Sequence, residues 1–214
     1  RLFKERLILK LSEILNNVEI IDTNFKLDKN KDVEKIAFHT DDVEKGSIFV
    51  AIKGYVTDGH KFIEKSKELG AEVAIVEYFV DVDIKQIKVE NSRITLADMA
   101  TNFYENPSKE MNIIGITATN GKTTTAFMID SILKRDKRKT GIIGTVLTRY
   151  DDIKIPSVLT TPESLVLQSY LRDMKDREIT DVTMEVSSSA QELFRNKNID
   201  FDIVTFNNLG REHI

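Results

Sequence analysis

The chain has 214 residues, of which 31 are Lys or Arg and 35 are Asp or Glu, so its formal net charge at pH 7 is −4. This balance argues against a general nucleic-acid binder, which needs a wide basic face. The sequence contains no cysteine, which excludes disulfides, thiolate zinc sites and a cysteine nucleophile and suits a reducing cytosol. Its apolar runs are far shorter than the ~20 residues of a membrane-spanning helix, so we expect a soluble, cytoplasmic protein without membrane insertion.

Residues 1–90 alternate short apolar runs with helical patterns, which is typical of βαβ units and a mainly parallel sheet. Gly70 directly follows one of the helical patterns, where glycine commonly ends a helix. The pattern predicts helices over residues 7–15 and 62–69 and strands over 48–52, 73–76 and 87–89. We place a domain boundary near Asn91, where the composition changes.

Beyond Asn91 the sequence predicts a helix over residues 94–104, which ends before Pro107 because the residue preceding a proline avoids the helical region. An apolar strand over 113–116 then leads through a glycine turn into another helix. The fold class is therefore α/β: a small N-terminal α/β domain over 1–90, followed over 91–214 by a phosphate-loop domain with a mainly parallel sheet. Because the chain opens at Arg1 and stops at Ile214 just after a strand-like run, we expect a fragment in which the second domain is incomplete.

The sharpest motif lies at residues 115–125, Gly-Ile-Thr-Ala-Thr-Asn-Gly-Lys-Thr-Thr-Thr. A loop between a strand and a helix exposes backbone N–H groups where the helix dipole favours phosphate. Gly121 lets the chain approach the phosphates, Lys122 can neutralise their charge, and Thr123 offers a hydroxyl to Mg²⁺. Ile116 stands where the strict Walker pattern has glycine, so the motif departs from that pattern by one position. We interpret the segment as a phosphate-binding loop.

Acidic and polar residues follow the later strands, at the sheet edge where parallel α/β proteins bind ligands. Glu185 lies near the end of a strand over residues 181–187 and is either a Mg²⁺ ligand or a solvated residue of an alternating strand. After the next strand, over 201–206, His213 is a better ligand candidate than His39 or His60, which we interpret as surface or turn histidines.

Residues 160–164, Thr-Thr-Pro-Glu-Ser, have the chemistry of a helix start. Thr161 is expected as the N-cap, Pro162 as the first helical residue and Glu163 in the first turn. Capping alone explains this segment, although a helix start can also hold an anion.

Together these motifs resemble the Mur ligases of bacterial cell-wall synthesis, whose phosphate loop reads Gly-x-x-Gly-Thr-Asn-Gly-Lys-Thr-Thr-Thr. The resemblance covers about residues 36–213 and is strongest to the branch that adds the third amino acid of the muramoyl peptide. It is carried by residues 46–54, 58–63, 115–125, 160–164, 184–188 and 206–213.

The resemblance implies an ATP- and Mg²⁺-dependent amide-bond-forming ligase. Such an enzyme phosphorylates UDP-MurNAc-L-Ala-D-Glu and adds a diamino acid through an acyl phosphate during peptidoglycan precursor synthesis. The catalytic set would be Lys122 on the phosphates, Glu185 with Thr123 on one Mg²⁺, and His213 at a second metal site. The implied nucleotide contacts are Thr119, Asn120, Gly121, Lys122, Thr123, Thr124 and Asn208. The implied substrate contacts are Thr160, Thr161, Ser187 and Arg195 for the muramoyl dipeptide, and Thr40, Lys53, Gly54, Asp58 and Gly59 around the uridine diphosphate.

The sequence departs from the family pattern in four places. Ala118 replaces a glycine of the phosphate loop, Thr40 lies in His-Thr-Asp where Asp-Ser-Arg is usual, Ser189 replaces a common histidine, and Glu212 replaces an aspartate. These departures are compatible with a divergent member that has another substrate. One alternative is another Mur-like amino-acid ligase, such as a cyanophycin synthetase or folylpolyglutamate synthase relative, although residues 54–60 argue against these relatives. The other alternative is a catalytically silent nucleotide-binding module. The family's amino-acid-selecting C-terminal domain is expected to be absent from this chain, and the sequence does not indicate the oligomeric state.

Overall fold

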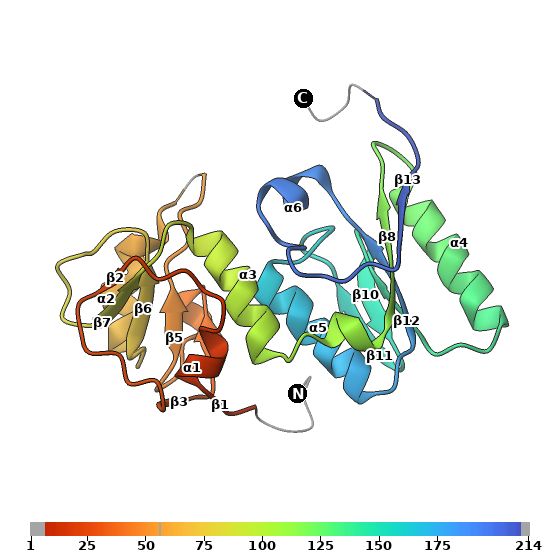
Figure 1. The fold of residues 1–214 in the computed structure, drawn as a ribbon. Helices are drawn as coiled ribbons and strands as arrows, with labels where there is room; N and C mark the ends of the chain where they lie inside the picture. The colour runs from red at the N-terminus through yellow and green to blue at the C-terminus, as the bar shows by residue number, and fades with distance from the viewer. Residues whose placement is uncertain (1–6, 56, 211–214) are drawn as a thin grey trace. The chain divides into compact units, whose positions relative to one another are not determined.

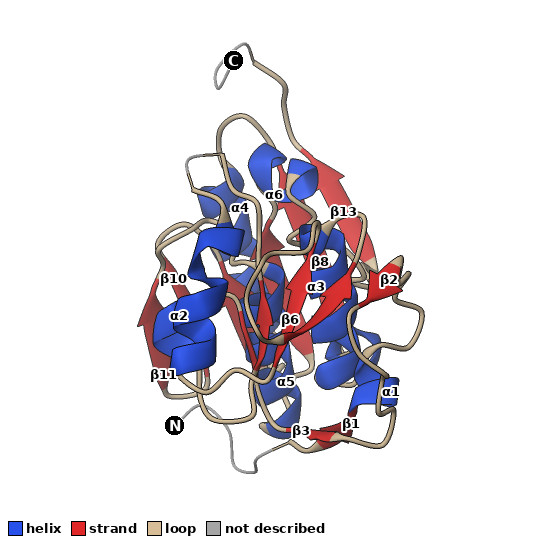
Figure 2. Ribbon diagram, turned by 90° about the vertical axis from the view of Figure 1, so that its left-hand side faces the viewer, coloured by secondary structure: helices blue, strands red, loops and turns tan. Residues whose placement is uncertain are grey.

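Helices and strands alternate along the chain in a computed structural model, which describes residues 7–55 and 57–210 (Figure 1). The alternation of the two element types confirms the α/β class (Figure 2). No helix among these residues has the length and apolarity needed to cross a bilayer. Tertiary contacts divide the chain into two units between Phe103 and Tyr104. The sequence placed the boundary earlier, near Asn91.

Helix α3 (Ser92–Phe103) belongs to the first unit because it packs against α1 (Leu11–Ile14). The side-chain amide of Asn102 in α3 donates to the carbonyl oxygens of Ile14 at 2.9 Å and Asn16 at 2.7 Å. These contacts join two helices that are far apart in sequence. A composition change near Asn91 could not reveal them.

The first unit is built on a five-stranded sheet in the order β2-β7-β6-β5-β4. Its strands β4 to β7 are parallel, and β2 is antiparallel to β7. The other elements are a two-stranded β1–β3 pair, two 3₁₀ helices and helix α2. The bounds are β1 Leu9–Lys10, β2 Asp22–Thr23, β3 Asp32–Val33, β4 Ile36–Ala37, η1 Thr40–Asp42, β5 Ile48–Val50, η2 Gly59–Phe62, α2 Ile63–Glu68, β6 Val73–Val76 and β7 Lys85–Lys88.

The predicted helix over residues 7–15 is shorter than expected. Leu9 and Lys10 pair with Val33 and Asp32 in an antiparallel ladder, so the helix begins only at Leu11. Helix α2 of this unit matches its prediction, since it ends at Glu68 and Gly70 adopts a left-handed φ of 111°.

The second unit is built on a six-stranded sheet in the order β11-β10-β9-β12-β8-β13. Strands β9, β12, β8 and β13 are parallel, and β10 and β11 form an antiparallel hairpin at one edge. The bounds are η3 Pro107–Glu110, β8 Asn112–Thr117, α4 Lys122–Arg135, β9 Thr140–Ile143, β10 Leu147–Tyr150, β11 Ile153–Pro156, α5 Ser164–Asp176, β12 Asp181–Glu185, α6 Ser188–Glu192 and β13 Ile203–Phe206.

Helices cover both faces of this sheet. On one face, Val182 and Met184 of β12 share a buried cluster with Leu171 and Met174 of α5. On the other face, Ala126 of α4 packs in a second cluster with apolar residues of β8 and β9. Strand β12 is therefore buried along its whole length, between two strands and beneath two helices.

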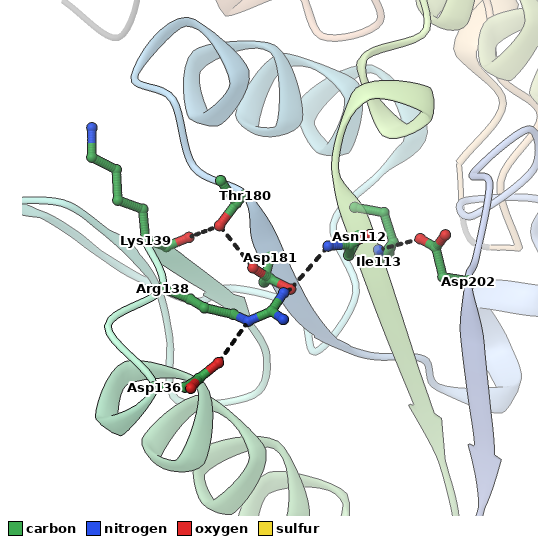
Figure 3. Close-up of polar contacts among 8 residues, drawn as sticks. All are labelled: Asn112, Ile113, Asp136, Arg138, Lys139, Thr180, Asp181 and Asp202. Carbon is green, nitrogen blue, oxygen red and sulfur yellow. Dashed lines mark hydrogen bonds and ion pairs between the residues drawn. The ribbon is translucent and has the colours of Figure 1, made fainter.

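A polar cluster ties together the starting ends of the parallel strands (Figure 3). The buried carboxylate of Asp181 accepts hydrogen bonds from Arg138 Nη1 at 2.9 Å, Asn112 Nδ2 at 3.1 Å and Thr180 Oγ1 at 2.7 Å. Nearby, Asp202 accepts from the backbone N–H of Ile113 at 2.7 Å. Asp181 thus has both a cationic partner and satisfied oxygens, as a buried carboxylate requires.

Candidate functional site

The predicted phosphate loop lies between β8 and α4. Gly121 is the N-cap of α4 with a left-handed φ of 85°, and no side chain caps the helix. The N–H groups of Lys122, Thr123 and Thr124 precede the first intrahelical hydrogen bond, so they have no acceptor within the helix. Donors of this kind at a helix N-terminus form a ready anion site.

Lys122 folds back over the loop. Its ammonium donates to the carbonyl oxygens of Ala118 at 2.7 Å and Thr119 at 3.3 Å. These are neutral acceptors, so the positive charge of the side chain stays available to an anion at the helix start. The phosphate contact that the motif predicts for this lysine stays a prediction.

Asn208, in the segment after β13, closes the other side of the loop. Its side chain donates to the carbonyl of Asn120 at 2.9 Å and accepts from the N–H of Asn120 at 3.1 Å. Its carbonyl accepts from the N–H of Thr119 at 3.1 Å. Two backbone N–H groups of predicted nucleotide contacts are therefore used inside the protein, where they hold the loop in shape.

Glu185 ends β12 directly beside the loop and is completely buried. It accepts from Thr123 Oγ1 at 2.9 Å, from Thr145 Oγ1 at 2.9 Å and from the backbone N–H of Thr145 at 3.0 Å. The interpretation of Glu185 as a solvated residue of an alternating strand is wrong, because β12 is a central strand with helices on both faces. The structure instead brings Glu185 and Thr123 together, as the metal-site hypothesis requires.

The two ends of β12 each carry a buried carboxylate, and their partners differ. Asp181 pairs with Arg138, whereas Glu185 forms no ion pair with any described residue. A buried charge without a cationic partner is costly unless a cation is supplied from outside the chain. Carboxylate and hydroxyl oxygens are hard ligands of the kind that Mg²⁺ prefers, so Glu185 and Thr123 fit this ion.

Gly144 and Thr145, which follow β9, also contribute to this site, and the sequence analysis missed both. A Cβ atom on Gly144 would lie 2.8 Å from the Glu185 carboxyl carbon, so only glycine leaves room for that side chain. The one feature of the sequence that could have indicated their role is their position directly after the parallel strand β9. Neither residue belongs to a chemically distinctive motif.

The predicted helix start at residues 160–164 lies further along the chain than expected. The N-cap of α5 is Glu163 and its first residue is Ser164, so the assignment of Thr161 as N-cap and Pro162 as first helical residue is wrong. The buried hydroxyl of Thr161 instead donates to the Glu185 carbonyl at 2.8 Å and accepts from the Ser187 N–H at 3.1 Å. Thr161 thereby ties this loop to the end of β12.

Arg195 faces the same loop. Its Nε donates to Glu163 Oε1 at 2.9 Å, and its Nη1 lies 3.5 Å from the Thr161 carbonyl. Ser187 caps the short helix α6 by accepting from the Ala190 N–H at 3.2 Å. The predicted dipeptide contacts Thr160, Thr161, Ser187 and Arg195 therefore come from segments linked by hydrogen bonds around the end of β12.

In the first unit, the predicted uridine-diphosphate contacts follow the ends of β4 and β5. Thr40 begins η1 after β4, and Lys53 forms an isolated bridge with Asp58 after β5. Gly59 has a steric reason for its identity, because a Cβ there would lie 2.6 Å from the Ile52 carbonyl oxygen. A Cβ on Gly54 would lie 2.9 Å from the Thr57 carbonyl oxygen.

His60 is buried, which corrects its interpretation as a surface or turn histidine. Its Nε2 accepts from the Glu77 N–H at 2.9 Å, so the proton sits on Nδ1, which donates to Asp58 at 2.6 Å. Tyr78 stacks on the imidazole with ring centroids 4.0 Å apart and donates to Asp58 at 2.6 Å. Burial alone would raise the pKa of Asp58, but hydrogen bonds from Tyr78 and His60 outweigh it and lower the pKa from 3.8 to about 2.

His213 lies outside the described residues. The second metal site that the sequence assigns to it stays a prediction.

A glycine loop between a strand and a helix, a buried carboxylate beside it and a sheet that presents both at its carboxyl edge are the arrangement of the phosphate-loop class of α/β proteins. Comparison with known families makes the class more specific. The Mur ligase catalytic-domain profile matches residues 32–104, and the Mur ligase middle-domain profile matches residues 116–214. The chain belongs to the Mur ligase family.

Curated relatives agree with this assignment. The chain is 41% identical over 213 residues to the UDP-N-acetylmuramoyl-L-alanyl-D-glutamate--2,6-diaminopimelate ligase of Clostridium botulinum, covering 96% of this chain and 43% of the relative. It is 43% identical over 183 residues to the same-named ligase of Bacillus velezensis, covering 86% of this chain and 37% of the relative. The chain thus spans less than half the length of these relatives.

Solved structures share the fold. A structure of a UDP-N-acetylmuramoyl-L-alanyl-D-glutamate--2,6-diaminopimelate ligase matches with a TM-score of 0.80 at 24% identity, over 97% of this chain and 42% of that one. MurF ligase from Thermotoga maritima, in complex with ADP, matches with a TM-score of 0.58 at 28% identity, over 84% of this chain and 38% of that one.

Proposed function

We propose that this chain supplies the nucleotide-binding and muramoyl-substrate-binding parts of an ATP-dependent ligase. The reaction joins a diamino acid to UDP-MurNAc-L-Ala-D-Glu. The observation that carries the proposal is the fully buried, unpaired Glu185 beside a phosphate loop. The cited curated relatives are all named for 2,6-diaminopimelate, which is therefore the amine that we propose.

In this proposal the ATP phosphates lie against the start of α4. The free N–H groups of Lys122, Thr123 and Thr124 would bind phosphate oxygens, and Lys122 would turn from its loop carbonyls toward the β- and γ-phosphates. Glu185 and Thr123 would hold Mg²⁺, which supplies positive charge to the transferring phosphoryl group when it is bound.

The muramoyl dipeptide would reach the same sheet edge from the loop that carries Thr160 and Thr161. Arg195 offers a guanidinium that can bind a carboxylate in a bidentate geometry. The substrate carboxylate attacks the γ-phosphorus, which forms an acyl phosphate and releases ADP. The amine then attacks the acyl carbon, forms the amide and expels phosphate, while its proton passes to water.

The uridine diphosphate end of the substrate is assigned to the first unit. Thr40, Lys53, Gly54, Asp58 and Gly59 lie after neighbouring parallel strands, where an α/β sheet binds ligands. We also propose a cytoplasmic location, because the substrates are cytoplasmic precursors of the cell wall. His213 is proposed for the second metal site.

The experiment compares the variants Lys122→Ala and Lys154→Ala. Lys154 is an exposed lysine on β11, so its substitution removes the same charge away from the site and serves as the matched control. ADP affinity is measured by calorimetry, and tripeptide formation from UDP-MurNAc-dipeptide and diaminopimelate is followed by mass spectrometry on the full-length protein. Loss of a charge-assisted phosphate contact predicts a roughly 10- to 100-fold weaker nucleotide affinity for Lys122→Ala alone. Equal affinities in both variants, or no tripeptide product from the unmodified protein, would contradict the proposal.

A further inference from the structure

Thr145 connects the two halves of the candidate site of the second unit. It lies in the connection between β9 and β10 and contacts the Glu185 carboxylate twice, through its backbone N–H at 3.0 Å and its hydroxyl at 2.9 Å. The same hydroxyl lies 3.1 Å from Thr160 Oγ1, in the loop proposed to face the dipeptide. The Thr145 side chain therefore touches both the carboxylate proposed for the metal and a residue proposed for the substrate.

The direction of these hydrogen bonds follows from the number of protons. A hydroxyl has one hydrogen, and an ionised carboxylate can only accept, so the hydrogen of Thr145 is used on Glu185. The hydrogen between the two threonines must then come from Thr160. Thr160 in turn has no hydrogen left to donate, and it presents only lone pairs to a ligand. An N–H of the bound peptide is the complementary partner.

The orientation of the carboxylate depends on the same contacts. Oε1 is held by the Thr145 N–H, and Oε2 receives hydroxyls from Thr145 and Thr123. Because Thr123 is itself a proposed metal ligand, Thr145 is the residue that can hold both oxygens while Thr123 turns toward an ion. Gly144 leaves the space in which this arrangement fits.

We propose that Thr145 is a positioning residue that fixes the Glu185 carboxylate for a divalent cation and fixes Thr160 as a hydrogen-bond acceptor for the peptide substrate. This inference rests on the proposed function. It assigns a role to a residue outside the proposed nucleotide contacts. Residues that orient a metal ligand in this way change metal affinity by about 10- to 100-fold when they are removed.

Thr145→Val removes the hydroxyl, keeps the backbone N–H and preserves the side-chain shape. Thr145→Ser keeps the hydroxyl and is the matched control. The side chain is exposed, so neither change opens a cavity in the core. Mn²⁺ binding in the presence of saturating ADP, measured by electron paramagnetic resonance, reports on the site without any turnover. Thermal unfolding verifies that each variant is folded. If Thr145→Val does not fold, Thr145→Ala replaces it as the variant without the hydroxyl.

We expect Mn²⁺ to bind roughly 10- to 100-fold more weakly to Thr145→Val and within about threefold of wild type to Thr145→Ser. The KM for the UDP-muramoyl dipeptide is expected to rise only in the variant without the hydroxyl. Wild-type Mn²⁺ affinity in Thr145→Val, or an equal loss in Thr145→Ser, would overturn the inference while leaving the proposed function intact. If the wild-type protein binds no Mn²⁺ with ADP, the proposed function fails as well.

Discussion

Glu185 is a carboxyl side chain that is completely buried. Three hydrogen bonds from two threonines satisfy its oxygens, and a glycine on the neighbouring strand end leaves the space that it occupies. Hydrogen bonds from neutral donors reduce the cost of burying a carboxylate but leave its charge uncompensated. This uncompensated charge is the basis of the proposed cation site.

Gly144→Ala tests this packing. The added methyl group would overlap the Glu185 carboxylate, so the side chain or the backbone must move. We expect the free energy of unfolding to fall by about 1–3 kcal/mol, as for other overpacked positions, and Mn²⁺ affinity with ADP to fall with it. Urea unfolding and metal titration measure the two effects. Unchanged values for both would show that the position tolerates a side chain.

Some individual residues could be predicted from the sequence and others could not. Lys122 and Thr123 follow from the phosphate-loop motif, because their chemistry and spacing are local. Glu185 was ambiguous, since an alternating pattern does not reveal whether a strand is central or at an edge. Thr161 and His60 were misinterpreted, because each makes its decisive hydrogen bonds with residues that are distant in sequence.

Among the secondary-structure elements, η2 and the end of β6 are joined by the cluster of Asp58, His60 and Tyr78. The depressed pKa of Asp58 makes this connection sensitive to acid. Because its folded-state pKa of about 2 lies below the ordinary value of 3.8, ionised Asp58 contributes stability that is complete above pH 3.8 and is lost as the pH falls toward 2.

Tyr78→Phe removes one donor to Asp58 and leaves the stacked ring in place. Since Tyr78 is partly exposed, we expect a loss of about 1 kcal/mol at neutral pH. This difference from wild type should shrink between about pH 4 and pH 2.5, where the carboxylate becomes protonated. Urea unfolding at both pH values measures it. A difference that is constant with pH would show that the hydroxyl acts independently of the Asp58 charge.

Helix α4 and the β10–β11 hairpin are joined by another buried carboxylate. Asp130 of α4 is ion-paired with Arg149 of β10, accepts from Thr140 Oγ1 at 2.7 Å and lies 3.2 Å from Lys134. The guanidinium of Arg149 also lies 5.8 Å from the centroid of the Phe127 ring. These contacts hold the helix of the phosphate loop against the hairpin.

Arg149→Met is expected to cost about 1–3 kcal/mol of unfolding free energy. This is less than for a fully buried pair, because Lys134 still neutralises part of the Asp130 charge. The double variant Arg149→Met/Asp130→Leu should recover part of that loss, since it removes the unpaired charge. Urea unfolding of the four proteins gives the coupling energy. Strictly additive losses would show that the two side chains do not interact.

The element order was largely predictable because apolar periodicity is a local signal. The helices α2 and α4, the strands β6 and β8 and the strand–loop–helix order of the phosphate loop all appear where the sequence places them. The start of α1 and the extent of the first unit were not predictable, because the β1–β3 pairing and the packing of α3 on α1 are long-range contacts.

In the whole molecule, the proposed ligand sites are divided between two units with separate sheets and cores. We therefore expect ADP with Mg²⁺ to protect the second unit from hydrogen exchange and uridine diphosphate to protect the first unit. In hydrogen exchange, ADP with Mg²⁺ is expected to protect residues 118–125 and 144–145, and uridine diphosphate to protect residues 40–42 and 52–59. Protection of the first unit by ADP alone would contradict this division.

Strand β13 forms one edge of the larger sheet, and no described strand pairs with its outer side. Ile203, Val204 and Phe206 expose more than half of their surface there. An open apolar edge is a template on which another polypeptide can add a strand. A further strand that pairs with β13 would extend the larger sheet and cover part of this apolar surface.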